Sequence, residues 1–227
     1  MKNAIGHDWK GKLSLVLLQD GTAMTFPLMP IYLRHPDRAY WFEFLPDTGI
    51  LYFQYNRATP DVQHPLAQFE EELLKAMIDH PRAVLIVDLR FNTGGDGNIA
   101  RQMMTDVQTA SAFRKVYIIV GRTTFSAGLF HAVQWKHWGK GTFVGKEPGD
   151  GLEFLAEGGN ILLPNSRLTI HFANARHCYS GASPTPSSEC FNELRIEPLA
   201  IALPASNTFD QYRSGRDAAL EAIVADR

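Results

Sequence analysis

The stretch Ala83-Val-Leu-Ile-Val-Asp-Leu-Arg-Phe-Asn-Thr-Gly-Gly95 decides the fold, because a continuous apolar run ends in a turn with paired glycines. Its first seven residues have the length and composition of a strand buried on both faces. Helical and strand patterns alternate around it: Leu66 to Asp79 is helical, Asn98 to Gln108 helical, Lys115 to Gly121 strand, and Ser126 to Trp138 helical. This order predicts an α/β fold with a mostly parallel sheet.

The flanking segments are rich in hairpin signals. We predict one hairpin within residues 1–39, where Leu13, Leu15, Leu17, Ile31 and Leu33 alternate with polar residues around the turn Asp20-Gly21. Further predicted elements are strands at Tyr40 to Leu45, Ile50 to Asn56, Asn160 to Leu163 and Arg167 to Phe172, and a helix at Asp217 to Val224 that Asp217 starts. We divide the chain into a β-rich segment, residues 1–39, and a core, residues 40–227.

The composition excludes several function classes. A hydrophobic content of 45%, a charged content of 20% and a net charge of -2 are those of an ordinary globular protein, without the basic excess of a nucleic-acid binder. The longest apolar runs are far shorter than the ~20 residues of a membrane-spanning helix, and Met1 to Asp20 lacks the pattern of a signal peptide. Neither dinucleotide nor P-loop glycine motif is present, and we expect no cofactor and no metal.

The two cysteines, Cys178 and Cys190, lie in a stretch whose Gly, Ser and Pro content predicts a loop. A loop-closing disulfide and a pair of free thiols are equally compatible with this pattern. Zinc ligation together with His177 is a weaker interpretation, because no second pair of ligands has the required spacing.

Two turns carry candidate chemistry, because the carboxyl ends of neighbouring parallel strands meet at one edge of a sheet. The first turn holds Gly94 and Gly95, which expose backbone N–H groups beside a helix N-terminus and suit a developing oxyanion. The second turn, Gly121 to Gly128, places Ser126 where its hydroxyl and the N–H of Ala127 can reach one carbonyl group. The simpler interpretation makes Ser126 a helix N-cap and the glycine pair an ordinary tight turn.

At these residues the sequence resembles the tail-specific, or carboxyl-terminal processing, serine proteases, a family that includes the tricorn core protease and retinoid-binding relatives. The matching segments, in family order, are LYFQYN (51–56), AVLIVDLRFNTGG (83–95), VYIIVGRTTFSA (116–127), TFVG (142–145), LLPNS (162–166) and GRDAALEAI (215–223). The resemblance implies a crotonase/ClpP-like β-α spiral, Ser126 as nucleophile and Gly95 and Ala127 as oxyanion donors, with Gly94 beside them. It also implies a peptide or protein substrate and, together with a possible disulfide, an extracytoplasmic location.

The general base departs from the family pattern. The processing proteases have a lysine about 25 positions after the serine, a position that Gly151 occupies here. The nearby candidates for a base or an orienting group are Lys146, Asp150 and Glu153. Tricorn-like members use a more N-terminal histidine, for which this chain offers His7, His35 and His64, whereas His131 lies too far along the helix from Ser126.

Other departures leave alternatives open. The PDZ module and the helical N-terminal region of relatives are absent, so the chain is expected to match only part of such a protein. Without a base, it would be a catalytically inactive binding protein with a protease fold. An acyl-thioester enzyme of the crotonase type would use the same paired amides but explains Ser126 poorly. Tyr55 and Asn56 either face the cleft or only terminate a strand. The oligomeric state is not predicted.

Overall fold

The computed structural model describes residues 6–8, 12–16, 23–27, 34–112, 114–181 and 188–227. The strands of its main sheet are β4 (Tyr40–Leu45), β5 (Ile50–Tyr55), β6 (Val84–Asp88), β7 (Val116–Val120), β8 (Thr142–Gly145) and β14 (Leu203–Pro204). They lie in the order β14-β8-β7-β6-β5-β4, and every neighbouring pair is parallel except the hairpin β4–β5. The mostly parallel sheet is therefore confirmed.

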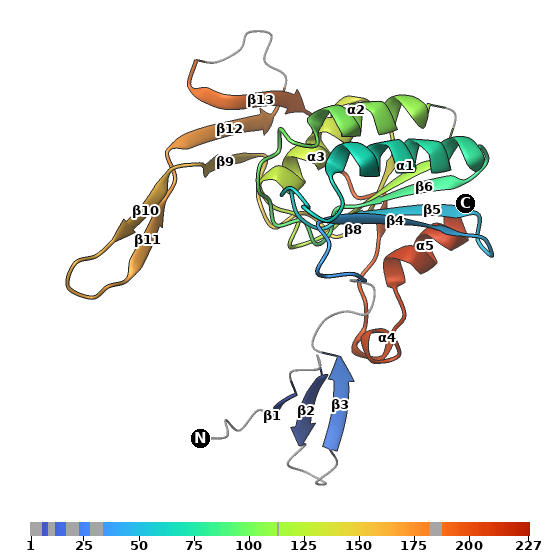
Figure 1. The fold of residues 1–227 in the computed structure, drawn as a ribbon, viewed down its shortest axis with the longest axis horizontal. Helices are drawn as coiled ribbons and strands as arrows, with labels where there is room; N and C mark the ends of the chain where they lie inside the picture. The colour runs from blue at the N-terminus through green and yellow to red at the C-terminus, as the bar shows by residue number, and fades with distance from the viewer. Residues whose placement is uncertain (1–5, 9–11, 17–22, 28–33, 113, 182–187) are drawn as a thin grey trace.

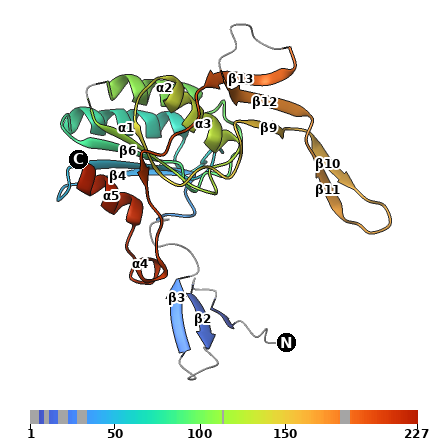
Figure 2. The same ribbon diagram turned by 180° about the vertical axis from the view of Figure 1, so that it is seen from behind.

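Helices cover both faces of this sheet (Figures 1 and 2). The helices α1 (Leu66–Asp79), α2 (Arg101–Ala110) and α3 (Ala127–His137) pack on one face, and α5 (Ala218–Asp226) packs on the other. All six residues of β5 are buried as a result. This double covering explains why the central strands are continuous apolar runs instead of alternating ones.

The predicted helices are present, with one shifted start. Helix α1 has the predicted bounds and ends before His80 and Pro81. Helix α2 begins at Arg101, not Asn98, because the preceding residues form tight turns in which Ile99 N donates to Asp96 O and Arg101 N to Asn98 O. Asp217 caps α5 as predicted, accepting hydrogen bonds from the amides of Ala219 and Leu220.

A second sheet lies against α3. Its strands β9 (Glu153–Ala156), β12 (Ala175–Ser180) and β13 (Cys190–Ile196) are ordered β13-β12-β9, with Tyr179 and Ile196 packed on Leu129, Phe130 and Val133. Helix α3 is consequently buried on all sides from Ala127 to Trp135. The prediction of a loop from Cys178 to Cys190 was wrong at both ends, because each cysteine is paired in a strand, Cys178 with Glu153 and Glu193 and Cys190 with Arg176. The Cys178–Cys190 disulfide is confirmed.

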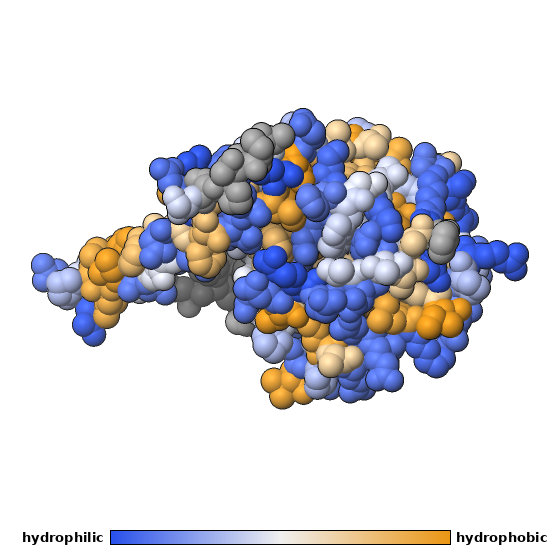
Figure 3. Space-filling view, turned by 90° about the horizontal axis from the view of Figure 1, so that it is seen from above, coloured by the Kyte–Doolittle hydropathy of each residue, from blue (hydrophilic) through white to orange (hydrophobic). Residues whose placement is uncertain are grey.

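Peripheral elements complete the chain. Strands β1 (Gly6–Asp8), β2 (Lys12–Val16) and β3 (Ala23–Pro27) form an antiparallel sheet that confirms the first hairpin, although Leu17, Asp20-Gly21, Ile31 and Leu33 lie outside the described residues. Strands β10 (Gly159–Leu162) and β11 (Thr169–Phe172) form the predicted pair as a projecting arm with exposed apolar side chains (Figure 3).

Helix α4 (Phe209–Arg213) was not predicted. Among the described residues, no helix combines the length and hydrophobicity that crossing a bilayer requires.

Candidate active site

The two predicted turns meet in space. Phe125 N donates to Asn92 O at 3.0 Å, and Thr124 Oγ1 donates to Leu89 O at 3.0 Å while it accepts from the amide of Gly121. The turns are packed so closely that a Cβ on Gly128 would lie 2.4 Å from Asn92 O. The expectation that the two turns are neighbours is confirmed by this contact.

Ser126 stands at the start of α3 in a strained backbone conformation. Its φ of 50° and ψ of -118° lie outside the regions that residues with a side chain favour. The serine takes the N-cap position, but its side chain makes no capping hydrogen bond. A cap therefore does not explain Ser126, and strain of this kind persists mainly where function requires it.

The glycine pair lies against this serine. A Cβ on Gly94 would be 3.1 Å from Ser126 Oγ and 3.5 Å from the amide nitrogen of Ala127. The Gly94 amide already donates to Asn92 Oδ1 at 2.9 Å. The Gly95 amide, in contrast, donates to no acceptor among the described residues, and Ala127 is the first residue of α3, whose amide has no partner within the helix.

A cavity of about 310 Å³ opens in front of these groups. Ser126, Gly95 and Ala127 line one side. Other lining residues come from the first turn and α2 (Asp96, Gly97, Asn98, Arg101), from α3 (Phe130), and from the second sheet and the loop after β9 (Glu157, His177, Tyr179, Phe191, Asn192). The site is thus enclosed between the carboxyl edge of the main sheet and the second sheet.

His177 lines this cavity from β12 and is only 7% exposed. Its ring stacks on Phe154 with centroids 4.6 Å apart, and its Nδ1 lies 3.0 Å from the Tyr179 hydroxyl. Its Nε2 makes no hydrogen bond of good geometry, although Glu157 Oε1 lies 3.3 Å away. This placement could not be predicted, because His177 lies 51 positions beyond Ser126 and directly before the segment Cys178 to Cys190, whose composition predicts a loop.

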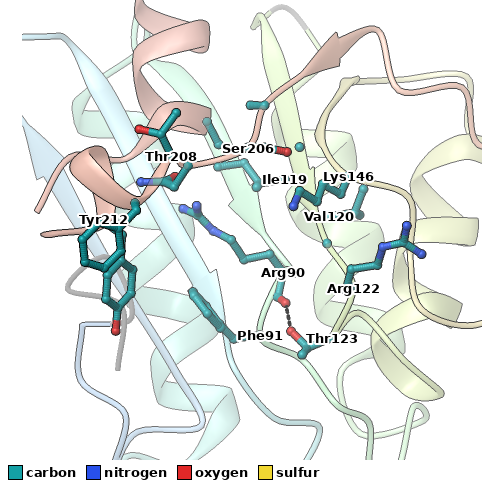
Figure 4. A pocket seen from close by; sticks show the side chains of 16 residues that line it. Arg90, Phe91, Ile119, Val120, Arg122, Thr123, Lys146, Ser206, Thr208 and Tyr212 are labelled. Carbon is teal, nitrogen blue, oxygen red and sulfur yellow. Dashed lines mark hydrogen bonds between the residues drawn. The ribbon is translucent and has the colours of Figure 1, made fainter. Parts of the chain in front are cut away.

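Three charged residues were predicted near the site, and the structure separates them. Lys146 is exposed and points into a different cavity of about 410 Å³, together with Arg90 (Figure 4). Glu153 accepts hydrogen bonds from the Ser180 hydroxyl at 2.7 Å and from Arg195 at 3.0 Å. Burial opposes its ionisation, but these partners hold the pKa of Glu153 below its usual value. Glu153 therefore links the strands of the second sheet through hydrogen bonds to β12 and β13.

Asp150 is the third of these residues. Its Oδ2 is buried without a hydrogen-bond partner among the described residues. Burial raises the pKa of the carboxyl group, and the Gly151 amide and the charge of His177 partly oppose that rise. Asp150 is thus electrostatically coupled to the histidine that lines the Ser126 cavity.

The other predicted residues lie elsewhere. His35 contacts Trp41, His64 lies 2.9 Å from Glu72, and neither lines the cavity. His131 is fully buried and its Nδ1 is 2.8 Å from Gln134 Oε1. Tyr55 and Asn56 are buried outside the cavity lining, as strand-terminating residues would be. The side chain of His7 is outside the described part of the chain.

Comparisons with known proteins give a fold match. No protein-family model matches the sequence, and no curated protein matches it. A "putative peptidase" from Parabacteroides merdae matches with a TM-score of 0.54 and 19% identity, over 86% of this chain and 68% of that one. A "putative S41 protease" from Bacteroides fragilis matches with a TM-score of 0.50 and 13% identity, over 95% and 66%.

This chain has the fold of those two proteins. It spans about two thirds of the length of each. The match agrees with the resemblance found in the sequence at the level of fold, and a fold alone does not determine the chemistry of a site.

Proposed function

We propose that this protein is a serine-type peptidase that cleaves peptide bonds through an acyl-enzyme on Ser126. The observation that carries the proposal is the uncapped, strained Ser126 beside Gly94, facing a cavity with the amides of Gly95 and Ala127. A nucleophile held next to two unpaired N–H groups is the arrangement that acyl transfer needs.

In this proposal, the Gly95 and Ala127 amides stabilise the oxyanion and Gly94 shapes the turn. Gly94 does not donate, because Asn92 Oδ1 already accepts its N–H. Loss of one such donor typically slows acyl transfer by roughly 10²- to 10³-fold. The crotonase/ClpP-like spiral and the division at residue 40 stay predictions.

The substrate class follows from the fold match and the site. Both structural neighbours are described as peptidases, and the cavity carries backbone and polar groups suited to a peptide. The Cys178–Cys190 disulfide agrees with an extracytoplasmic location, because disulfides persist in oxidising compartments.

The competing function is peptide binding without catalysis. The observation that favours it is the position of Lys146, which lines another cavity and leaves the family's lysine without a counterpart beside Ser126. The two functions differ in whether Ser126 reacts covalently.

Reaction with a fluorophosphonate probe tests the proposal. We expect wild type to take up one phosphonyl group, located at Ser126 by peptide mass spectrometry, and Ser126→Ala to take up none. Ser166→Ala is the matched control, because Ser166 is an exposed serine at the tip of the β10–β11 arm, and it should react like wild type.

Labelling that persists in Ser126→Ala would disprove the assignment of the nucleophile. If the folded wild-type protein binds peptides but is neither labelled by the probe nor able to cleave them, it is the catalytically inactive binding protein. Acyl-CoA binding without labelling would indicate the thioester chemistry instead.

A further inference from the structure

We propose that His177 is the general base that activates Ser126, an inference that rests on the proposed function. The lysine position of the processing proteases is Gly151, so the proton of the serine needs another acceptor. His177 is the histidine among the described residues that lines the same cavity as Ser126.

The second sheet brings His177 to this place. His177 pairs with Phe154 of β9 and with Asn192 of β13, and Tyr179, two residues on, lies on the same face of β12. This face packs on α3 through Tyr179, which contacts Leu129 and Phe130. Because Ser126 begins α3 and the second sheet packs on α3, Ser126 and His177 line the same cavity.

The surroundings fix the ring in one orientation. The Phe154 ring stacks on the imidazole almost in parallel, at an interplanar angle of 8°. The centroid of the Phe191 ring lies 5.6 Å from that of the imidazole. Nδ1 lies 3.0 Å from the Tyr179 oxygen, which accepts a second hydrogen bond from Asn192 Nδ2 at 3.2 Å. The proposal requires the tautomer in which Nδ1–H donates to Tyr179, so that Nε2 carries no proton.

Carboxylates beside the ring suit the charge that forms on it. Glu157 Oε1 lies 3.3 Å from Nε2, and Asp150 is electrostatically coupled to the ring. Glu157 has a positive φ of 57°. The charged and titratable groups that face His177 or its cavity are Glu157 and Asp150 from the loops flanking β9, Tyr179 from β12, Asp96 from the first turn and Arg101 from α2.

The proposed steps balance in protons. His177 Nε2 takes the Ser126 Oγ proton as Oγ bonds to the carbonyl carbon, and gives that proton to the amide nitrogen as the C–N bond breaks. Water then attacks the acyl group, its proton passes to Nε2 and returns to Oγ, and the carboxylic acid product leaves. The net reaction consumes one peptide bond and one water.

The test measures the rate of fluorophosphonate labelling at Ser126 against pH. We expect His177→Gln to slow labelling by at least about 100-fold, the usual contribution of a positioned base, and to lose the decrease in rate that wild type shows on acidification. Added imidazole should partly restore labelling in His177→Ala, which a structural role would not allow. His171→Gln on the exposed strand β11 is the control and should behave like wild type.

The outcomes separate this inference from the proposed function. If His177→Gln labels at the wild-type rate with the same pH dependence, His177 is not the base, while Ser126 remains the nucleophile. If the probe never labels the wild-type protein, both the assignment of His177 as the base and the proposed peptidase function are wrong. If His177→Gln loses its circular dichroism signal, the wild-type profile decides, because a labelling rate that does not fall on acidification overturns the proposal.

Discussion

At the residue scale, Gly95 lies where the first turn contacts Ala58. Its φ is 124°, and a Cβ there would lie 2.2 Å from the backbone oxygen of Ala58. Ala58 O also accepts the amide of Asp96 at 2.8 Å, so it cannot move away without breaking the turn.

Gly95→Ala should therefore disable the site. We expect a loss of at least roughly tenfold in the Ser126 labelling rate and a destabilisation of about 1–3 kcal/mol, measured by urea unfolding. Gly139→Ala is the matched control, because Gly139 has a φ of 64° but no atom within 4 Å of an added Cβ. Gly139→Ala should lower the free energy of unfolding only by the strain of a left-handed backbone, about 1–2 kcal/mol, and should leave the Ser126 labelling rate unchanged. Wild-type labelling in Gly95→Ala would contradict the role of this turn.

His131 predicts a pH dependence of stability. Burial lowers its pKa to about 4, against an unfolded value of about 6.5. Below pH 6.5 the unfolded chain binds a proton that the native state does not bind, so the free energy of unfolding falls until about pH 4. Between pH 7.5 and pH 5, we expect this histidine to lower the free energy of unfolding by about 2 kcal/mol. His131→Leu should show a correspondingly smaller difference between urea unfolding at the two pH values; an equal difference would refute the assignment.

At the scale of elements, Arg90 connects the end of β6 to α5. Its guanidinium donates to both carboxylate oxygens of Asp217, at 2.8 and 2.6 Å, and lies 2.8 Å from Asp88 Oδ2. The three side chains are 11%, 10% and 0% exposed. Removing the cation would leave two nearly buried carboxylates facing each other.

We expect Arg90→Met to lower the free energy of unfolding by about 3–5 kcal/mol, as for other broken buried ion pairs. Arg216→Met is the control, because Arg216 pairs with Glu221 in an exposed setting, where an ion pair contributes little to stability. Urea unfolding of the two variants measures the contrast. Equal effects would show that the Arg90 contacts do not hold these elements together.

The elements that could be predicted are those whose pattern is local. The apolar runs of β6 and β7, the helical spacing of α1 and the cap at Asp217 appear directly in the sequence. The strands β12 and β13 could not be predicted, because Tyr179 and Ile196 are buried against α3, a contact between distant segments. The later start of α2 has a local cause instead, the turn bonds from Ile99 N to Asp96 O and from Arg101 N to Asn98 O.

At the scale of the whole molecule, the candidate site is formed by three segments far apart in the chain. The sequence was sufficient to predict that the turns holding Gly95 and Ser126 are neighbours, because the carboxyl ends of adjacent parallel strands lie at one edge of a sheet; the catalytic roles of these residues stay a proposal. The wall that carries His177 was missed, since only the packing of the second sheet on α3 brings it across the cavity. Lys146 was a candidate by its sequence distance from Ser126, but it lines another cavity.

The crystal structure of the fluorophosphonate-treated protein would show whether Ser126 is the nucleophile and whether the Gly95 and Ala127 amides form the oxyanion hole. We expect phosphorus bonded to Ser126 Oγ, and one phosphonyl oxygen about 3 Å from the amide nitrogens of both Gly95 and Ala127. A phosphonyl group on another residue, or an oxygen directed away from both amides, would contradict the account.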